Sequence, residues 1–147
     1  MITIQKFDKK QLFKTAKQEE VNNFLFKSLQ EYGDPKSDIN DAMNYALGLE
    51  NSPGGFVLVA FDENKVVGSV VVNRTGMKKY IPENILVYIA TDPEYRGKGI
   101  GKNLMETAIE TAEGSIALHV EPNNPAKGLY EKLGFTNKYL EMRYIKK

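Results

Sequence analysis

The 147-residue sequence contains no cysteine and only one histidine, His119. The absence of cysteine excludes disulfides, a cysteine nucleophile and cysteine metal ligands. With a single histidine, neither a histidine-based catalytic triad nor a site built from several histidine ligands is expected. The sequence therefore predicts chemistry that needs no metal.

Long apolar runs and an excess of one charge are absent as well. No apolar stretch approaches the ~20 residues that a membrane-spanning helix needs, and the N-terminal MITIQKFDKK lacks the long apolar centre of a signal peptide. The net charge is +1, so no basic field favours nucleic acid or an anionic membrane as a partner. We expect a cytoplasmic protein that binds neither of them.

What the sequence does contain fits one globular domain over residues 1–147, with 41% hydrophobic and 27% charged residues. Its periodicities predict ten elements in the order β-α-α-β-β-β-α-β-α-β. The expected strands cover 1–7, 56–61, 66–72, 85–90, 115–120 and a last segment around Leu140, Met142 and Tyr144. The fold class is therefore α+β (mixed α/β), a central mixed β-sheet with helices on both faces.

The predicted helices lie between these strands. The first falls within 9–32, and Leu12, Phe13 and Ala16 belong either to it or to a shorter helix before it. The second follows Gly33-Asp34-Pro35 and is capped by Ser37 or Asp38. The third begins near Gly99, with Ile100, Leu104, Ala108, Ile109 and Ala112 as its apolar face. The fourth is capped by Asn124, ends at Gly134 and buries Leu129 and Leu133.

A glycine-rich loop after the strand at 85–90 is the main candidate for a ligand site. Gly97, Gly99 and Gly101 have no Cβ, so a ligand can approach the backbone closely. The helix that follows adds the positive end of its dipole. The loop lacks the Walker A pattern, and its glycines, each two residues from the next, do not fit a dinucleotide fingerprint. The loop predicts a phosphate or pyrophosphate site.

Two segments carry a resemblance to a known family. RGKGIG at residues 96–101 resembles the [RQ]-x-x-G-x-[GA] signature of the GNAT acyltransferase superfamily. NNPAKGLYEKLGF at residues 123–135 resembles that family's N-x-x-A-x-x-L-Y-x-x-x-G-F motif. The interval between the two motifs and the order of predicted elements are also similar to those of GNAT proteins.

The resemblance implies that the chain binds acetyl-CoA as acyl donor. The pantetheine arm would lie between the strands at 85–90 and 115–120, which splay apart in the family. The pyrophosphate would rest on backbone N–H groups of the loop, in agreement with the argument from the helix N-terminus. The residues implied in binding are Ile89, Ala90, Thr91, Arg96, Gly97, Lys98, Gly99, Ile100, Gly101, Lys102, Asn103, Asn123 and Tyr130.

Acetyl transfer to an amine also requires proton transfers and stabilisation of an oxyanion. By resemblance, the oxyanion donor is strand backbone near Ile89, and Tyr130 is the general acid for the departing thiolate. The alternative role for Tyr130 is that of a core aromatic beside Leu129 and Leu133, and the full motif favours the catalytic one. For the base, Glu83 and Glu121 are the candidates, each acting through water.

The sequence says least about the molecule that accepts the acetyl group. The resemblance places it beside the segment that joins the first two helices, where acidic side chains suit a cationic amine. We expect a small-molecule amine or a peptide amine as partner, and a homodimer is compatible with the family. The alternative function is a sensor module that binds CoA or acyl-CoA without turnover. The residues of the joining segment that suggest the acceptor are Glu31, Tyr32, Asp34, Asp38 and Asp41.

Overall fold

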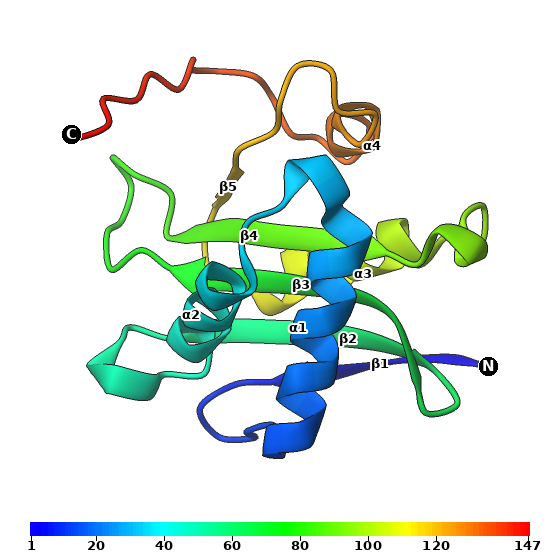
Figure 1. The fold of residues 1–147 in the computed structure, drawn as a ribbon. Helices are drawn as coiled ribbons and strands as arrows, with labels where there is room; N and C mark the ends of the chain where they lie inside the picture. The colour runs from blue at the N-terminus through cyan, green and yellow to red at the C-terminus, as the bar shows by residue number, and fades with distance from the viewer.

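The computed structural model describes the backbone of residues 1–147 and every side chain except that of Ala16. Its strands and helices run in the predicted order up to the ninth element (Figure 1). Three 3₁₀ turns, at 30–32, 49–51 and 93–95, join some of them. The elements are β1 (Ile2–Phe7), α1 (Thr15–Leu29), α2 (Lys36–Ala46), β2 (Gly55–Asp62), β3 (Lys65–Arg74), β4 (Asn84–Thr91), α3 (Ile100–Thr111), β5 (Ile116–Leu118) and α4 (Lys127–Lys132).

The five strands form one mixed sheet in the order β1-β2-β3-β4-β5. The first four pair antiparallel, and β5 lies parallel to β4. Helices α1 and α2 cover one face and α3 the other (Figure 1). The predicted fold class, a mixed sheet with helices on both faces, is confirmed.

The core has two parts, one on each face of the sheet. Strands β2 and β3 are buried almost throughout, because their successive side chains point alternately into the two parts of the core. The α1/α2 cluster is the part that α1 and α2 form with sheet residues such as Val59, Val71 and Tyr88. The α3 cluster is the part that α3 forms with sheet residues such as Leu58 and Val70, and it also contains Tyr130 of α4.

Several boundary predictions need correction. Helix α1 begins at Thr15, so Leu12 and Phe13 precede it, and the Phe13 ring stacks on Phe7 with centroids 3.9 Å apart. The side chain of Ala16 lies outside the described residues. Neither Ser37 nor Asp38 caps α2, whose N-cap residue is Pro35.

On α3, Ile100, Leu104 and Ala108 are buried as predicted, and Met105, which the prediction did not include, is buried too. Ile109 is 41% exposed, so its assignment to the apolar face is wrong. Helix α4 buries Tyr130, while Leu129 and Leu133 are half-buried.

The predicted last strand is also wrong. Leu140, Met142 and Tyr144 alternate as a strand would, but residues 136–147 form no strand. A strand needs a partner edge as well as a pattern. The tail leaves α4 and runs clear of the sheet (Figure 1). Among the described helices, none has the length and apolar character to span a bilayer.

Candidate active site

The glycine-rich loop turns the chain from β4 into α3 through two left-handed residues. Gly97 has φ +81° and Gly99 has φ +77°, a region that side chains with a Cβ rarely adopt. A Cβ at either position would meet nothing within 4 Å. The loop therefore needs glycine at these two positions for its backbone conformation, and the space beside them is open to a ligand.

This loop presents a run of free backbone donors. The N–H groups from Gly97 to Lys102 take no partner from the described part of the chain, whereas the N–H of Asn103 bonds Gly99 O at 3.0 Å. The N–H groups of a helix's first turn have no intrahelical acceptor. The dipole of the twelve-residue α3 adds partial positive charge at the same end. Together these groups suit an anion of phosphate type.

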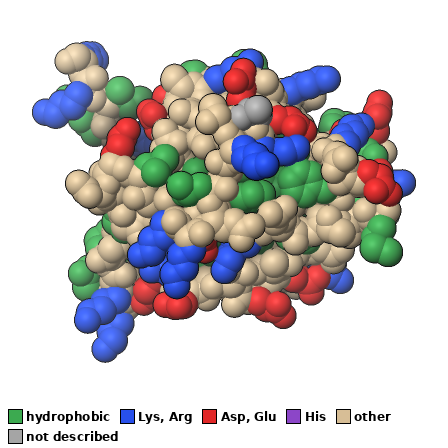
Figure 2. All heavy atoms as spheres, turned by 90° about the horizontal axis from the view of Figure 1, so that it is seen from below, with side chains coloured by type: hydrophobic (Ala, Val, Ile, Leu, Met, Phe, Trp, Pro, Cys, Tyr) green, Lys and Arg blue, Asp and Glu red, His purple; other side chains and the backbone are tan. Residues whose placement is uncertain are grey.

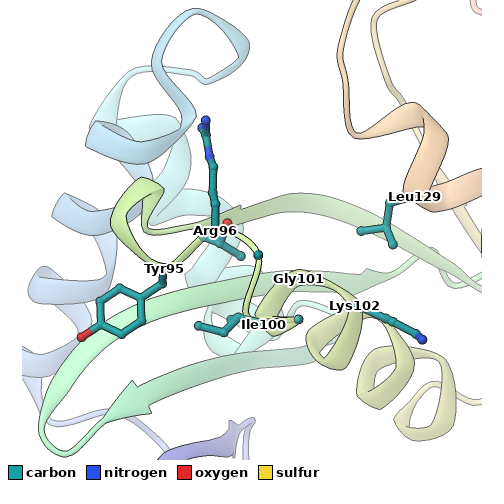
Figure 3. A pocket seen from close by; sticks show the side chains of 9 residues that line it. Tyr95, Arg96, Ile100, Gly101, Lys102 and Leu129 are labelled. Carbon is teal, nitrogen blue, oxygen red and sulfur yellow. The ribbon is translucent and has the colours of Figure 1, made fainter.

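A hollow of about 200 Å³ lies against these donors. Figure 3 shows Leu129 of α4 facing Gly101 and Lys102 across it, while the Tyr95 ring points away toward the β2–β3 side. Gly101 closes the hollow from the α3 side, where a Cβ would lie 3.6 Å from Thr91 Cγ2 and 3.8 Å from Leu129 Cδ2. The residues that line it are Thr91, Tyr95, Arg96, Gly97, Gly99, Ile100, Gly101, Lys102 and Leu129.

The loop is tied to the β2–β3 hairpin by side chains that the sequence did not single out. The Tyr95 hydroxyl donates to Asp62 Oδ2 at 2.6 Å, and Lys65 Nζ lies 3.5 Å from Asp92 Oδ2. The hydrogen bond from Tyr95 lowers the pKa of the Asp62 carboxyl. Lys98 lies over the Tyr95 ring, 5.3 Å from its centroid. These contacts hold the donor-bearing backbone in place.

A second hollow, of about 60 Å³, lies where β4 and β5 separate. Their pairing ends at Leu86↔Leu118, next to a bulge at which Val71 faces Tyr88 and Val72 faces Leu86. Beyond this point the β4 edge has no β5 partner, so its backbone groups are open to another molecule. The hollow is lined by Leu29, Tyr32, Leu86, Val87, Tyr88, Ile89, Leu118, His119, Asn124 and Tyr130.

Tyr130 enters this second hollow from α4. It is 6% exposed, and burial raises the pKa of its hydroxyl. Within the described part of the chain, that hydroxyl has no hydrogen-bond partner. The side chain is therefore a neutral donor that a ligand in the hollow can reach.

Glu83, the first candidate base, lies elsewhere. Its carboxylate accepts hydrogen bonds from Ser115 N at 2.8 Å and from Lys79 N at 3.1 Å. These bonds lower its pKa, which weakens it as a base. Glu83 holds the loop before β4 to the start of β5, and it lines neither hollow.

The structure gathers most of the predicted binding residues along the two hollows, with four exceptions. Ala90 points into the α1/α2 cluster. Lys98 and Asn103 are exposed beside the first hollow without lining it. Asn123 is exposed, and its neighbour Asn124 lines the second hollow instead.

Asn124 was predicted as a helix cap. Its Oδ1 accepts from Ala126 N at 2.9 Å, one turn before α4 begins, and the N-cap residue itself is Ala126. The bond is therefore an Asx turn. It fixes the Asn124 side chain at the edge of the second hollow.

One face of the molecule carries side chains of both charges (Figure 2). On the face shown in Figure 2, Lys and Arg side chains lie among Asp and Glu side chains, so neither sign forms a continuous field. The N-terminus of α3 adds partial positive charge beside the loop.

Comparison with known proteins identifies the family. Residues 53–137, which hold β2 to α4, match the family model described as the acetyltransferase (GNAT) domain. The match includes the whole lining of the first hollow and all of the second except Leu29 and Tyr32. The chain belongs to the GNAT acetyltransferase family.

Individual relatives agree with this assignment. The chain is 32% identical over 84 residues to a 5-NmdU N-acetyltransferase of Pseudomonas phage PaMx11, covering 56% of this chain and 58% of the relative. It is 30% identical over 97 residues to the N-alpha-acetyltransferase RimI of Mycobacterium tuberculosis, covering 65% and 61%. The chain spans between 30% and 61% of the length of the curated relatives that it matches.

A solved structure shares the fold over nearly the whole chain, a longer stretch than the sequence matches cover. The aminoglycoside N-acetyltransferase AAC(6')-Iy, solved in complex with CoA, superposes with a TM-score of 0.69. The match covers 99% of this chain and 95% of that one at 16% identity. At this identity the likeness concerns the fold alone.

Proposed function

We propose that this chain transfers an acetyl group from acetyl-CoA to a primary amine. The observation that carries the proposal is the run of unpartnered N–H groups from Gly97 to Lys102 at the start of α3. In a chain of the GNAT family, such a run suits the pyrophosphate of CoA. The relatives named above are N-acetyltransferases, which favours an amine as the acceptor.

The donor would extend along the two hollows. With its pyrophosphate on the loop, the pantetheine arm follows the unpaired edge of β4 from Thr91 toward Ile89. Backbone groups that β5 leaves free can hydrogen-bond the amides of the arm. The thioester then reaches the second hollow, beside Tyr130.

In the proposed reaction the amine attacks the thioester directly and displaces the thiolate of CoA. The amine nitrogen attacks the thioester carbonyl carbon, the C–N bond forms, and the carbonyl oxygen becomes an oxyanion that a backbone N–H near Ile89 stabilises. The C–S bond then breaks, and the departing thiolate takes the proton of the Tyr130 hydroxyl. The proton lost by the amine goes to solvent, and solvent restores the hydroxyl.

A sensor that binds acyl-CoA without turnover is the second candidate. The observation in its favour is that Glu83, one of the two carboxylates considered as bases, is engaged in bonds to Ser115 and Lys79. The unpartnered Tyr130 hydroxyl argues for catalysis, because a binding module has no use for an acid at the thioester.

One experiment separates the two functions. The protein is incubated with acetyl-CoA and a panel of primary amines, and free thiol is followed over time. Acetyl transfer predicts thiol release well above the uncatalysed rate with at least one class of amine. If calorimetry shows acetyl-CoA binding but no amine raises thiol release, the chain is a sensor and the enzymatic proposal is wrong.

A further inference from the structure

His119 is a basic side chain at the second hollow to which the transfer chemistry above gives no role. It directly follows β5, just beyond the point where the pairing of β4 with β5 ends. It lines the hollow together with Tyr130. Histidine is the side chain that most readily takes up and releases a proton near neutral pH, and this chain contains one. A proton acceptor therefore stands where the thioester is proposed to reach.

The side chain of His119 faces the side of the hollow opposite Tyr130. Leu118 and Val120, the residues before and after it, pack against the α3 cluster, to which Tyr130 also belongs. Successive side chains of an extended segment point to opposite faces, so His119 points away from that cluster. A ligand in the hollow therefore meets a hydroxyl donor on one side and an imidazole on the other.

The other titratable side chains of the hollow are tyrosines, namely Tyr32, Tyr88 and Tyr130. A phenol keeps its proton at neutral pH, and burial raises the pKa of Tyr88 and of Tyr130 further. The Tyr88 hydroxyl also donates to Asp34 Oδ2 at 2.6 Å. Among the residues that line the hollow, His119 is therefore the one that can accept a proton at neutral pH.

The tail brings a carboxylate close to His119. Glu141 Oε1 lies 3.9 Å from His119 Nδ1, and Glu141 also pairs with Arg143. At this distance the carboxylate attracts an imidazolium without a direct hydrogen bond. Within the described part of the chain, neither ring nitrogen of His119 is hydrogen-bonded. The side chain is 57% exposed, so a proton that it takes up can pass on to water.

The two carboxylates predicted as bases are placed less well. The Glu83 carboxylate accepts from Ser115 N and Lys79 N, and Glu121 is exposed and lines neither hollow. A general base must lie within hydrogen-bond reach of the proton that it takes, directly or through one water. His119 lies in the lining itself.

We propose that His119 is the general base of the transfer and takes the proton that the amine loses. The amine nitrogen gives this proton to a ring nitrogen of His119 as its bond to the carbonyl carbon forms. The imidazolium then releases the proton to solvent, and the departing thiolate takes the proton of Tyr130. Acid and base thus act from opposite sides of the opening between β4 and β5. The inference rests on the proposed acetyl transfer and adds a catalytic residue to the same site.

The first test replaces His119 with glutamine, which is polar and of similar size but takes up no proton at neutral pH. With the most active amine of the panel, kcat/KM falls about 100-fold at about pH 7, a loss within the range of general base catalysis. The KM for acetyl-CoA stays unchanged. Glu110→Gln, which alters a carboxylate on the exposed side of α3, leaves both quantities as they are. An unchanged kcat/KM in His119→Gln overturns the proposal, as does a loss of rate in Glu121→Gln instead.

The pH dependence separates a base from a residue that only shapes the hollow. With a base present the amine can react from its ammonium form, so kcat/KM of the unaltered protein levels off once the imidazole is neutral. In His119→Gln the reaction depends on free amine, and kcat/KM keeps rising toward the alkyl ammonium pKa of about 10. Added imidazole restores part of the lost rate in His119→Ala by acting as an external base. If the two pH profiles are parallel and imidazole restores nothing, the proposal is wrong.

Failure of the proposed transfer would show separately, as the absence of turnover in the unaltered protein. In that case the proton NMR signals of the single histidine are compared between the complexes with acetyl-CoA and with CoA. A shift that requires the acetyl group supports the position of His119 beside the thioester even without catalysis. Identical signals in the two complexes remove His119 from the site.

Discussion

At the scale of single residues, Tyr130 combines burial with a hydroxyl that no described residue engages. Burial disfavours the charged phenolate, so the pKa of Tyr130 is raised and the group keeps its proton. A donor in this state matches what a departing thiolate needs. Phe135 packs against the ring, with centroids 6.1 Å apart, and helps to fix its position.

Replacing Tyr130 with phenylalanine removes the acid and keeps the packing. We expect kcat to fall about 100-fold, the usual scale for general acid catalysis, with the Kd for acetyl-CoA unchanged within twofold. Since the pKa is raised, Tyr130 stays protonated beyond the ordinary tyrosine value of about 10. The alkaline fall of kcat that belongs to Tyr130 therefore lies above about pH 10. Stopped-flow thiol release and calorimetry measure these quantities, and an unchanged kcat would exclude Tyr130 as the acid.

Glu83 shows why the position of a carboxylate along the sequence does not by itself identify the general base. It directly precedes β4, the strand that borders both hollows, yet its carboxylate bonds the backbone at Ser115 and Lys79. Lys79 lies four residues away, but Ser115 lies 32 residues away along the chain, so no local pattern indicates the bond to Ser115.

At the scale of elements, the loop between β4 and α3 depends on the β2–β3 hairpin. The hydrogen bond from Tyr95 to Asp62 and the ion pair of Lys65 with Asp92 connect the two. Asp92 N also bonds Val67 O of β3 at 2.8 Å. Without these contacts the free N–H groups would have to be ordered by the ligand at an entropic cost.

The Tyr95 contact can be tested with a matched control. Tyr95→Phe removes the hydroxyl that bonds Asp62, and we expect the Kd for acetyl-CoA to rise about threefold to tenfold with little change in kcat. Tyr45→Phe removes another tyrosine hydroxyl bond, to Arg74 O at 2.6 Å, far from the loop, and leaves the Kd unchanged. Calorimetric titration of both variants decides the matter, because equal Kd values would show that the loop is ordered without Tyr95.

At the scale of the whole molecule, the tail from Tyr139 to Ile145 contributes nothing to either core cluster. Five large apolar side chains there are between 74% and 92% exposed. The clusters extend no further along the chain than Phe135. Stability in this structure therefore comes from the sheet and the four helices.

Polar substitutions in the tail test this directly. Because Leu140 and Met142 are 86% and 92% exposed, replacing both with serine removes no buried apolar area, and the Tm should shift by less than about 2 °C. Thermal unfolding followed by circular dichroism measures it. A fall of more than about 5 °C would mean that the tail packs as a strand in solution, as its alternation predicts.

The sequence alone determined the features that depend on local chemistry. The helical period located four helices, and alternation or a short apolar run located five strands. The glycine spacing before α3 indicated an anion site, because a left-handed backbone and a helix N-terminus are both local properties.

Only the tertiary structure decided what depends on contacts between distant segments. The β4–β5 pairing ends next to the bulge opposite Val71 and Val72, where the second hollow lies, and no local pattern predicts where two strands separate. The partners of Tyr88 and Glu83 are likewise set by packing. A strand in the tail has the right alternation but needs an edge to pair with, and only the arrangement of the whole chain supplies or withholds one.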